Sequence, residues 1–235
     1  MCSSDLGGCA TWFLERLLEK GIVDAVLCVG QGPGHERLFD YRIASTPAML
    51  RDCSKSAYYP VEMSGIIRML REDRRTFAII GLPCFIKAVQ RAREANPRLR
   101  KRIIVTAGIT CGHLPAKSMT QEMAISIGQD PREIAGVRFR VKAEDKKATQ
   151  FCTEYAMKNG ATARAYSELE ISFFQRLFSQ QSCDFCDDIF AECADVSFMD
   201  AWLPEYADDQ RGMSLVIARS ELSASVFAGD RKSVV

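Results

Sequence analysis

The stretch TFAIIGLPCFIKAVQ, residues 76–90, predicts the fold of this chain. Its apolar run is typical of a buried strand, a Gly-x-Pro step ends that run, and the residues that follow have helical spacing. A thiol, Cys84, stands at the expected start of the helix. Because a helix dipole stabilises a thiolate at that end, Cys84 is predicted to be reactive or a metal ligand. The alternative is a small buried hydrophobic residue.

The same alternation of strand and helix patterns continues along most of the chain. We therefore predict an α/β fold with a mixed, largely parallel sheet flanked by helices and a cysteine-rich loop near the C-terminus. The basic stretch RLRKR, residues 98–102, is interpreted as a solvated connector. The predicted strands cover 22–29, 37–45, 76–80, 103–110, 136–141 and 149–157, and the predicted helices cover 9–21, 60–73, 85–96 and 119–127.

Composition excludes several classes of protein. The chain has 235 residues, 47% hydrophobic and 26% charged, with a net charge of +1, which suits one or two globular domains and no nucleic-acid partner. No apolar run reaches the roughly 18 residues of a membrane span, and no signal peptide is recognisable, so we expect a cytoplasmic location. Ten cysteines in such a protein point to metal or redox chemistry.

The two ends of the sequence look foreign to the rest. MCSSDL (residues 1–6) and DRKSVV (230–235) resemble in-frame translations of sequencing-adapter ends. We therefore expect a single native domain over residues 7–229, cut at both ends, with Cys2 outside it.

The stretch GQGPGHER, residues 30–37, looks at first like a dinucleotide-binding loop. The third glycine position of that motif is occupied by His35, and Pro33 lies inside the loop. A Rossmann fingerprint is therefore not predicted.

Four cysteines have spacings that suit one metal centre. Cys183 and Cys186 form a C-x-x-C pair, which by itself suits zinc, a redox disulfide or an iron-sulfur site. Cys84 and Cys111 each follow a predicted strand, and such strand ends meet at one edge of an open α/β sheet. With no second C-x-x-C in the sequence, two strand-end thiols and one pair predict a four-sulfur site for a 4Fe-4S cluster.

Six segments of the chain carry a family resemblance together. They are, in order, GGCATWFLERLLEKGIVDAVL, SKSAYYPVE, GLPCFIKAVQ, GITCGH, CDFCDDIFAECADVSFMDAW and GMSLVIAR. In this order they resemble the coenzyme F420 hydrogenase/dehydrogenase beta-subunit family. The resemblance implies an oxidoreductase that binds FAD and a 4Fe-4S cluster and passes electrons between them and a partner or substrate, with cluster thiolates that correspond to Cys84, Cys111, Cys183 and Cys186.

A flavin requires a close backbone approach to its pyrophosphate, which glycines at a helix N-terminus permit. Gly7 and Gly8 precede the first predicted helix and fit this role, and the alternative is an ordinary helix start. Ser56 and Tyr58 offer hydroxyl groups for a phosphate or the ribityl chain, or else form a turn and a cap. The family often has a lysine at the position of Ala57, so the contacts of this loop are left open.

Further candidates lie beyond the C-x-x-C pair. Asp200, Trp202 and Ser214 fall in the part that resembles the flavin-side loop of the family, and the alternative is a core tryptophan beside a capping aspartate. His113 follows Cys111 by two residues and is a candidate for a hydrogen bond near the cluster, or a polar loop residue. Three carboxylates, Asp184, Asp187 and Asp188, lie beside the pair and would lower the potential of a cluster. Cys9, Cys28, Cys53, Cys152 and Cys193 are interpreted as small core residues.

The predicted function is a flavin- and iron-sulfur-dependent oxidoreductase that relays electrons between a small-molecule hydride carrier and a one-electron partner. That partner would be an electron-transfer protein or a ferredoxin-like domain, and a deazaflavin is one candidate carrier. The alternatives are a zinc-stabilised binding module and a cofactor-free structural subunit of a larger redox complex. The colour of the anaerobically purified protein would separate these alternatives, since a flavin and a cluster make it brown-yellow. Coordinates would separate a cluster from zinc, because sulfurs around a 4Fe-4S cluster lie roughly 6–7 Å apart and sulfurs around zinc lie under about 4 Å apart.

Overall fold

The computed structural model describes residues 8–34, 36–142, 151–166, 176–201 and 213–229. Six strands form one sheet in the order β2-β1-β3-β4-β8-β9. The four central strands are parallel, and β2 and β9 pair antiparallel at the two edges, so the predicted mixed, largely parallel sheet is confirmed. The strands are β1 (Ala25–Gly34), β2 (Arg37–Ala44), β3 (Phe77–Gly81), β4 (Ile103–Ile109), β8 (Val196–Asp200) and β9 (Ser214–Ala218).

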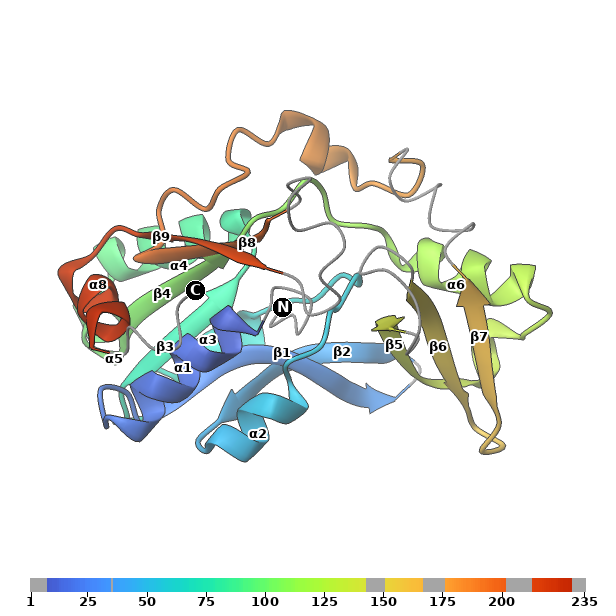
Figure 1. Cartoon of the computed structure of the whole chain (residues 1–235), viewed down its shortest axis with the longest axis horizontal. Coiled ribbons are helices and arrows are strands. Elements are labelled where there is room, and N and C mark those ends of the chain that lie inside the picture. Colours follow the sequence, from blue (N-terminus) through green and yellow to red (C-terminus); the bar gives the residue numbers. More distant parts are fainter. Residues whose placement is uncertain (1–7, 35, 143–150, 167–175, 202–212, 230–235) are drawn as a thin grey trace.

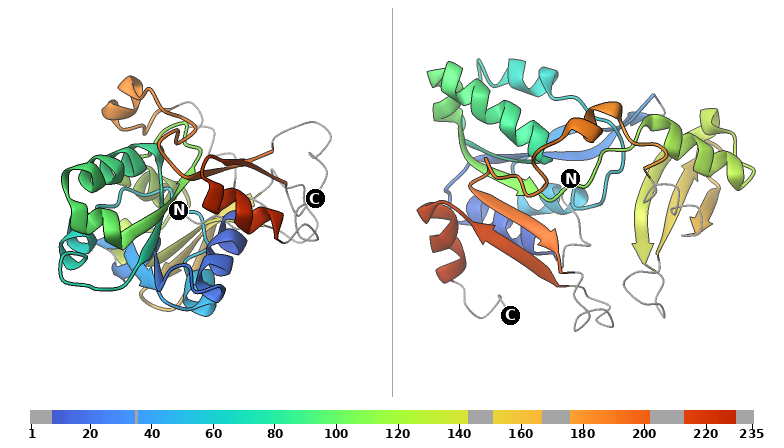
Figure 2. Two further views of the ribbon diagram at one scale, coloured as in Figure 1. Left: turned by 90° about the vertical axis from the view of Figure 1, so that its left-hand side faces the viewer. Right: turned by 90° about the horizontal axis from the view of Figure 1, so that it is seen from above.

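Helices cover both faces of this sheet, as Figures 1 and 2 show. One core joins the sheet to α1 (Cys9–Glu19), α2 (Pro47–Asp52) and α8 (Glu221–Ala228). The opposite core joins it to α3 (Ser64–Met69), α4 (Pro83–Ala95) and α5 (Pro97–Arg102). Among the described residues, every helix is too short or too polar to span a lipid bilayer.

A second, smaller sheet lies at the other end of the molecule from α8 (Figure 1). It is antiparallel, in the order β5-β6-β7, with β5 (Ile134–Lys142), β6 (Phe151–Met157) and β7 (Thr162–Tyr166). A third core packs this sheet and α6 (Lys117–Ser126) against residues of β1 and β2. The Gln31 side-chain amide donates to the Val137 carbonyl at 2.9 Å and ties the two sheets together.

The stretch at residues 76–90 folds as its sequence predicts. All five residues of β3 are buried, which explains their continuous apolar run. Pro83 occupies the first turn of α4, where its fixed φ suits a helix and its missing N–H leaves no bond unmade. Cys84 is therefore the second residue of that helix, directly after the buried strand.

Three segments differ from the sequence prediction. The helix expected over 60–73 covers only α3, because the chain from Pro60 is not helical until Ser64. The basic connector forms the short helix α5, since the Asn96 side chain caps it by accepting from the amides of Arg98 and Leu99. The glycine-rich stretch after residue 29 continues β1 as far as Gly34. His35 lies outside the described residues.

Candidate functional site

Two of the predicted thiols meet at one edge of the large sheet. Cys84 follows β3, and Cys111 follows β4 by two residues. The two strands are parallel neighbours, with Gly81 opposite Gly108 near their carboxyl ends. Both cysteines therefore emerge at the same edge, as the alternation of strands and helices predicts.

The C-x-x-C pair lies on η3 (Gln181–Phe185) and the residue after it, far along the chain but close in space. Figure 1 shows this segment in orange, passing over the top of the molecule between the small sheet and β8. The Leu114 amide donates to the Cys183 sulfur at 3.3 Å, and the Cys111 amide donates to the Ile189 carbonyl at 3.0 Å. Backbone bonds thus hold the pair against the loop that begins at Cys111.

The electrostatics of Cys111 and Cys84 indicate that all four thiols lie near one another. The pKa of Cys111 is raised to about 12, mainly by burial and also by Cys84, Cys183 and Cys186, while the His113 amide opposes this shift. Partial desolvation of its sulfur also raises the pKa of Cys84, although the residue as a whole is exposed, with added contributions from Cys186 and Cys183, and the Phe85 amide at the start of α4 opposes them. Such effects require short separations. The predicted stabilisation of the Cys84 thiolate by its helix is therefore outweighed by burial.

The four thiols lie close together without the tight packing of a single-ion site. No three His, Cys, Asp or Glu side chains in the described part of the chain are placed to hold one metal ion. Cys84 and Cys186 are exposed, and Cys111 and Cys183 are half-buried. The group therefore forms an open, sulfur-rich surface at the sheet edge.

Two side chains hold the segment that follows Cys186. The buried Asp188 carboxylate accepts from the Glu192 amide at 3.1 Å, so this aspartate is not one of the exposed charges expected from the sequence. Arg219 donates to the Ala191 carbonyl at 3.2 Å and to the Ser197 hydroxyl at 2.7 Å. The chain between the C-x-x-C and β8 is fixed from both sides.

Asp184 and Asp187 are exposed and paired with cations, since Arg176 lies 3.2 Å from Asp184 and Lys87 lies 3.0 Å from Asp187. His113 is half-buried beside the same loop.

The other cysteines divide into two groups. Cys28 and Cys53 belong to a core, Cys152 is buried and Cys9 packs against a core, as predicted. Cys193 is exposed, so its assignment as a core residue is wrong. It lies in the turn before β8, where its carbonyl accepts from the Gln90 side chain at 2.6 Å.

The flavin candidates lie in several separate elements. Gly8 is the N-cap of α1 and has φ 78°, a left-handed conformation that favours glycine. Among the described residues, no atom beyond its chain neighbours lies within 4 Å of the position that a Cβ would take there, so these residues leave room for a ligand. Gly7 lies outside the described residues.

An unpredicted residue, Arg140, joins two of the predicted ones. Its guanidinium donates to the Tyr58 hydroxyl at 3.3 Å and to the Asp200 carboxylate at 3.4 Å. The side chains of Arg140 and Asp200 are only 10% and 15% exposed. Ser56, two residues before Tyr58, is buried. Tyr58 and Asp200 therefore belong to one polar site.

The alternation in VRFRV, residues 137–141, places Arg140 on the side opposite to the buried Val137 and Phe139. In the structure this alternation is interrupted at Arg140. The pairing register shifts between Arg138 and Val141, and Arg140 has a φ of 53°. Such a bulge redirects a side chain, and no residue type in this stretch signals it.

Ser214 lies opposite Asp200 across the β8–β9 pair. Its hydroxyl oxygen is buried and has no hydrogen-bond partner among the described residues. Trp202 lies outside those residues.

Comparison with known proteins identifies the family. Two family models describe the C terminus and the N terminus of the coenzyme F420 hydrogenase/dehydrogenase beta subunit, and they match residues 74–234 and 2–68, respectively. An F420-dependent formate dehydrogenase 1 subunit beta from Methanococcus maripaludis is 26% identical over 183 residues, covering 77% of this chain and 44% of that protein. An uncharacterized protein from Methanocaldococcus jannaschii is 27% identical over 194 residues, covering 81% of this chain and 67% of that protein.

A solved structure shares the fold. A chain of the F420-reducing [NiFe] hydrogenase complex from Methanosarcina barkeri aligns with a TM-score of 0.68 at 17% identity, covering 96% of this chain and 72% of that chain. This chain therefore spans less than half of the formate dehydrogenase protein and nearly three quarters of the hydrogenase chain. By the matches of both family models, the chain belongs to the coenzyme F420 hydrogenase/dehydrogenase beta-subunit family.

Proposed function

We propose that this chain relays electrons between a small-molecule hydride carrier and a one-electron protein partner, using a 4Fe-4S cluster and FAD. The family is one of oxidoreductase subunits, which gives the general role in electron transfer. Four thiols from three separate segments lie near one another at one sheet edge, and this observation supports the proposed cluster.

The donor set fits an iron-sulfur cluster. Cys84, Cys111, Cys183 and Cys186 would supply four soft thiolates, the ligands that such clusters take. Cys84, Cys183 and Cys186 each contribute to the raised pKa of Cys111, which supports placing all four thiols around one centre. Zinc also takes four thiolates, so metal analysis of the purified protein distinguishes the two centres.

The polar site around Arg140 fits a flavin. A guanidinium next to hydroxyl and carboxylate groups can bind phosphate and ribityl oxygens, and Gly8 at the start of α1 permits a close approach. Tyr58, Ser56, Asp200 and Ser214 would orient the cofactor from the surrounding elements. Ser214 has a buried hydroxyl that lacks a partner among the described residues, as a ligand contact would require.

The two cofactors would supply the redox chemistry, because a flavin exchanges both hydrides and single electrons, while a cluster exchanges single electrons only. The residues of this chain would position them. Arg219 and Asp188 keep the C-x-x-C segment in place, and the low exposure of Arg140 and Asp200 limits water near the flavin.

The protein partner would dock near the exposed end of the thiol group. Phe185 stands between Cys183 and Cys186 and is 89% exposed, and the neighbouring Ile189 and Phe190 are also exposed. An apolar surface beside a one-electron centre suits a protein that must approach closely to receive the electron. Two of the relatives named above are a subunit of an enzyme and a chain solved within a complex, which supports a protein partner.

Anaerobic purification followed by absorption spectroscopy and cofactor analysis tests the proposal. We expect brown-yellow protein with a broad absorption band in the violet and FAD in the supernatant after denaturation. Colourless protein with one zinc per chain would favour the zinc-stabilised module. Colourless protein without metal or flavin would favour a structural role, and either result would overturn the proposal.

A further inference from the structure

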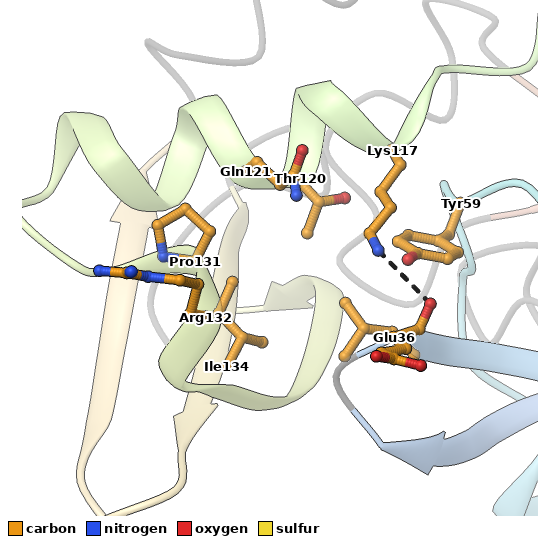
Figure 3. Close-up of a pocket in the computed structure, with 9 residues that line it drawn as sticks. Glu36, Tyr59, Lys117, Thr120, Gln121, Pro131, Arg132 and Ile134 are labelled. Carbon is orange, nitrogen blue, oxygen red and sulfur yellow. Dashed lines mark hydrogen bonds between the residues drawn. The ribbon is translucent and has the colours of Figure 1, made fainter.

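A cavity of about 240 Å³ opens between the β1–β2 hairpin, α6 and the start of β5 (Figure 3). None of the thiol or flavin candidates lines it. It lies where the third core joins the two sheets, and its wall combines cations, hydroxyl groups and apolar side chains. Such a wall can bind a molecule that has both a polar and an apolar part.

The first such group is the Lys117 ammonium. Its contact within the described residues is a long one of 3.4 Å to the Glu36 main-chain carbonyl, and it forms no ion pair there. Lys117 is also the first residue of α6, which has no side-chain cap and no acidic residue in its first turn. A cation is disfavoured at a helix N-terminus, so this corner of the cavity has positive charge without a matching anion.

The second group is a buried hydroxyl one turn along the same helix face. Thr120 is 1% exposed, and its side-chain oxygen has no hydrogen-bond partner among the described residues. Figure 3 shows Lys117 and Thr120 both extending from α6 into the space above β2 and β5. A buried hydroxyl without a partner is unfavourable, and a ligand acceptor at this point would satisfy it.

The remaining walls limit the size and polarity of the occupant. Leu38 and Ile134 provide buried apolar surface, and Arg132 brings a second cation that is already paired with Asp130 at 2.7 Å. The volume lies below the roughly 300–1,000 Å³ of drug-sized sites, so only a small molecule fits. The wall therefore suits one anionic group attached to a short apolar chain.

We propose that this cavity binds a small aliphatic carboxylate, with its carboxylate at Lys117 and Thr120 and its chain against Leu38 and Ile134. A carboxylate accepts from both the ammonium and the hydroxyl, and charge-assisted bonds of this kind are the strong ones. Glu36 also lines the cavity, and its carboxylate would oppose the ligand and weaken its affinity without removing the site.

Calorimetric titration of the full chain with butyrate, acetate and inorganic phosphate at constant ionic strength tests the proposal. We expect butyrate to bind more tightly than acetate, because its longer chain covers apolar wall, and both to bind more tightly than phosphate. Tightest binding by phosphate, or no binding of any of the three, would overturn it. The titration does not require the cluster or the flavin, so its failure would leave the proposed function untouched.

Four variants sharpen this test. Lys117→Met should weaken butyrate binding about tenfold through loss of a charged bond, and Thr120→Val, of similar shape, should weaken it to a smaller extent. Glu36→Gln should strengthen binding by removing the opposing charge. Lys101→Met makes the same charge change on the exposed surface of α5 and should leave binding unchanged. Equal effects of Lys117→Met and Lys101→Met would show nonspecific attraction and contradict the site.

Discussion

At the scale of single residues, Arg140 links the elements of the polar site most directly. Its guanidinium bridges Tyr58 from the loop before α3 and Asp200 from the end of β8, and it lies 4.8 Å from the centre of the Phe151 ring. These contacts join both sheets around one charge. The left-handed backbone at Arg140 is tolerated because the surrounding contacts fix it.

Replacing this arginine should affect both stability and flavin retention. Arg140→Met removes the cation that lies 3.4 Å from the largely buried Asp200 carboxylate, so we expect a loss on the order of 3 kcal/mol in the free energy of unfolding. Denaturant unfolding and the FAD content after gel filtration measure the two effects. Arg138→Met is the matched control, because Arg138 is exposed and pairs with Glu154 on the small sheet. Equal flavin loss in both variants would contradict the role of Arg140.

Cys53 offers a test of local electrostatics away from the proposed site. A hydrogen bond from Cys28 lowers its pKa from 9.0 to about 7, assisted by Arg42 and opposed by burial. Because the folded pKa lies below the unfolded one, this thiolate stabilises the fold fully above pH 9 and loses that contribution as the pH falls through 7.

The alkylation rate of Cys53 should therefore rise with a midpoint near pH 7. Peptide mass spectrometry can follow it on the tryptic fragment 52–55, which separates Cys53 from Cys28 on fragment 21–37. Cys28→Val should move the midpoint upward. A midpoint unchanged by that substitution would show that Cys28 does not lower the pKa of Cys53.

At the scale of elements, β4 and the segment after the C-x-x-C approach each other closely. A Cβ on Gly108 would lie 2.2 Å from the Ala191 Cβ and 3.2 Å from the Ala194 Cβ. The Gly108 position thus permits the contact that brings the cysteine-rich segment onto the sheet.

Gly108→Ala should destabilise the fold by about 1–3 kcal/mol through overpacking. Gly65→Ala in α3 is the control, since the described part of the chain places nothing within 4 Å of its Cβ position and alanine favours a helix by about 0.5–1 kcal/mol. Thermal unfolding of both variants gives the comparison. A stable Gly108→Ala variant with parent-like iron content would contradict the close approach.

The side-chain contacts of Arg219 and Lys87 with the C-x-x-C segment should differ in how much they slow the loss of iron. Arg219→Met removes bonds to the Ala191 carbonyl and the Ser197 hydroxyl, so iron should be lost faster to a chelator. Lys87→Met breaks a solvent-exposed pair with Asp187 and should change that rate little. The rate at which the visible absorption bleaches after a chelator is added measures the iron loss in both variants. Faster loss of iron from the Lys87→Met variant than from the Arg219→Met variant would contradict this prediction.

The sequence predicts the elements around Cys84 well because β3 is buried on both faces and Pro83 marks the helix start. It does not predict β8 and β9, whose short runs follow a loop-like cysteine region. Arg140 is missed because a bulge overrides the strand alternation, and the cavity at Lys117 is missed because distant segments form it. Local patterns thus identify elements and strand-end residues, while contacts set by irregular backbone require coordinates.

At the scale of the whole molecule, the parallel sheet brings the candidate cluster ligands and one residue of the polar site to one edge. β3 and β4 present Cys84 and Cys111, the segment before β8 adds the C-x-x-C pair, and β8 ends at Asp200. The small sheet contributes Arg140 from the side. A thiol group and a polar site on neighbouring elements are what a relay between a cluster and a flavin needs, because electrons must pass between them over a short distance.

The iron and acid-labile sulfide content of two serine variants tests this account most directly. After anaerobic purification, Cys111→Ser should lose most of its iron, because a hard oxygen replaces one of four soft ligands. Cys193→Ser should keep the iron and sulfide of the parent, about four of each per chain, since Cys193 is not among the thiols that shift the pKa of Cys84 or Cys111. Iron lost from Cys193→Ser but retained in Cys111→Ser would contradict the four-thiol site and the electron relay built on it.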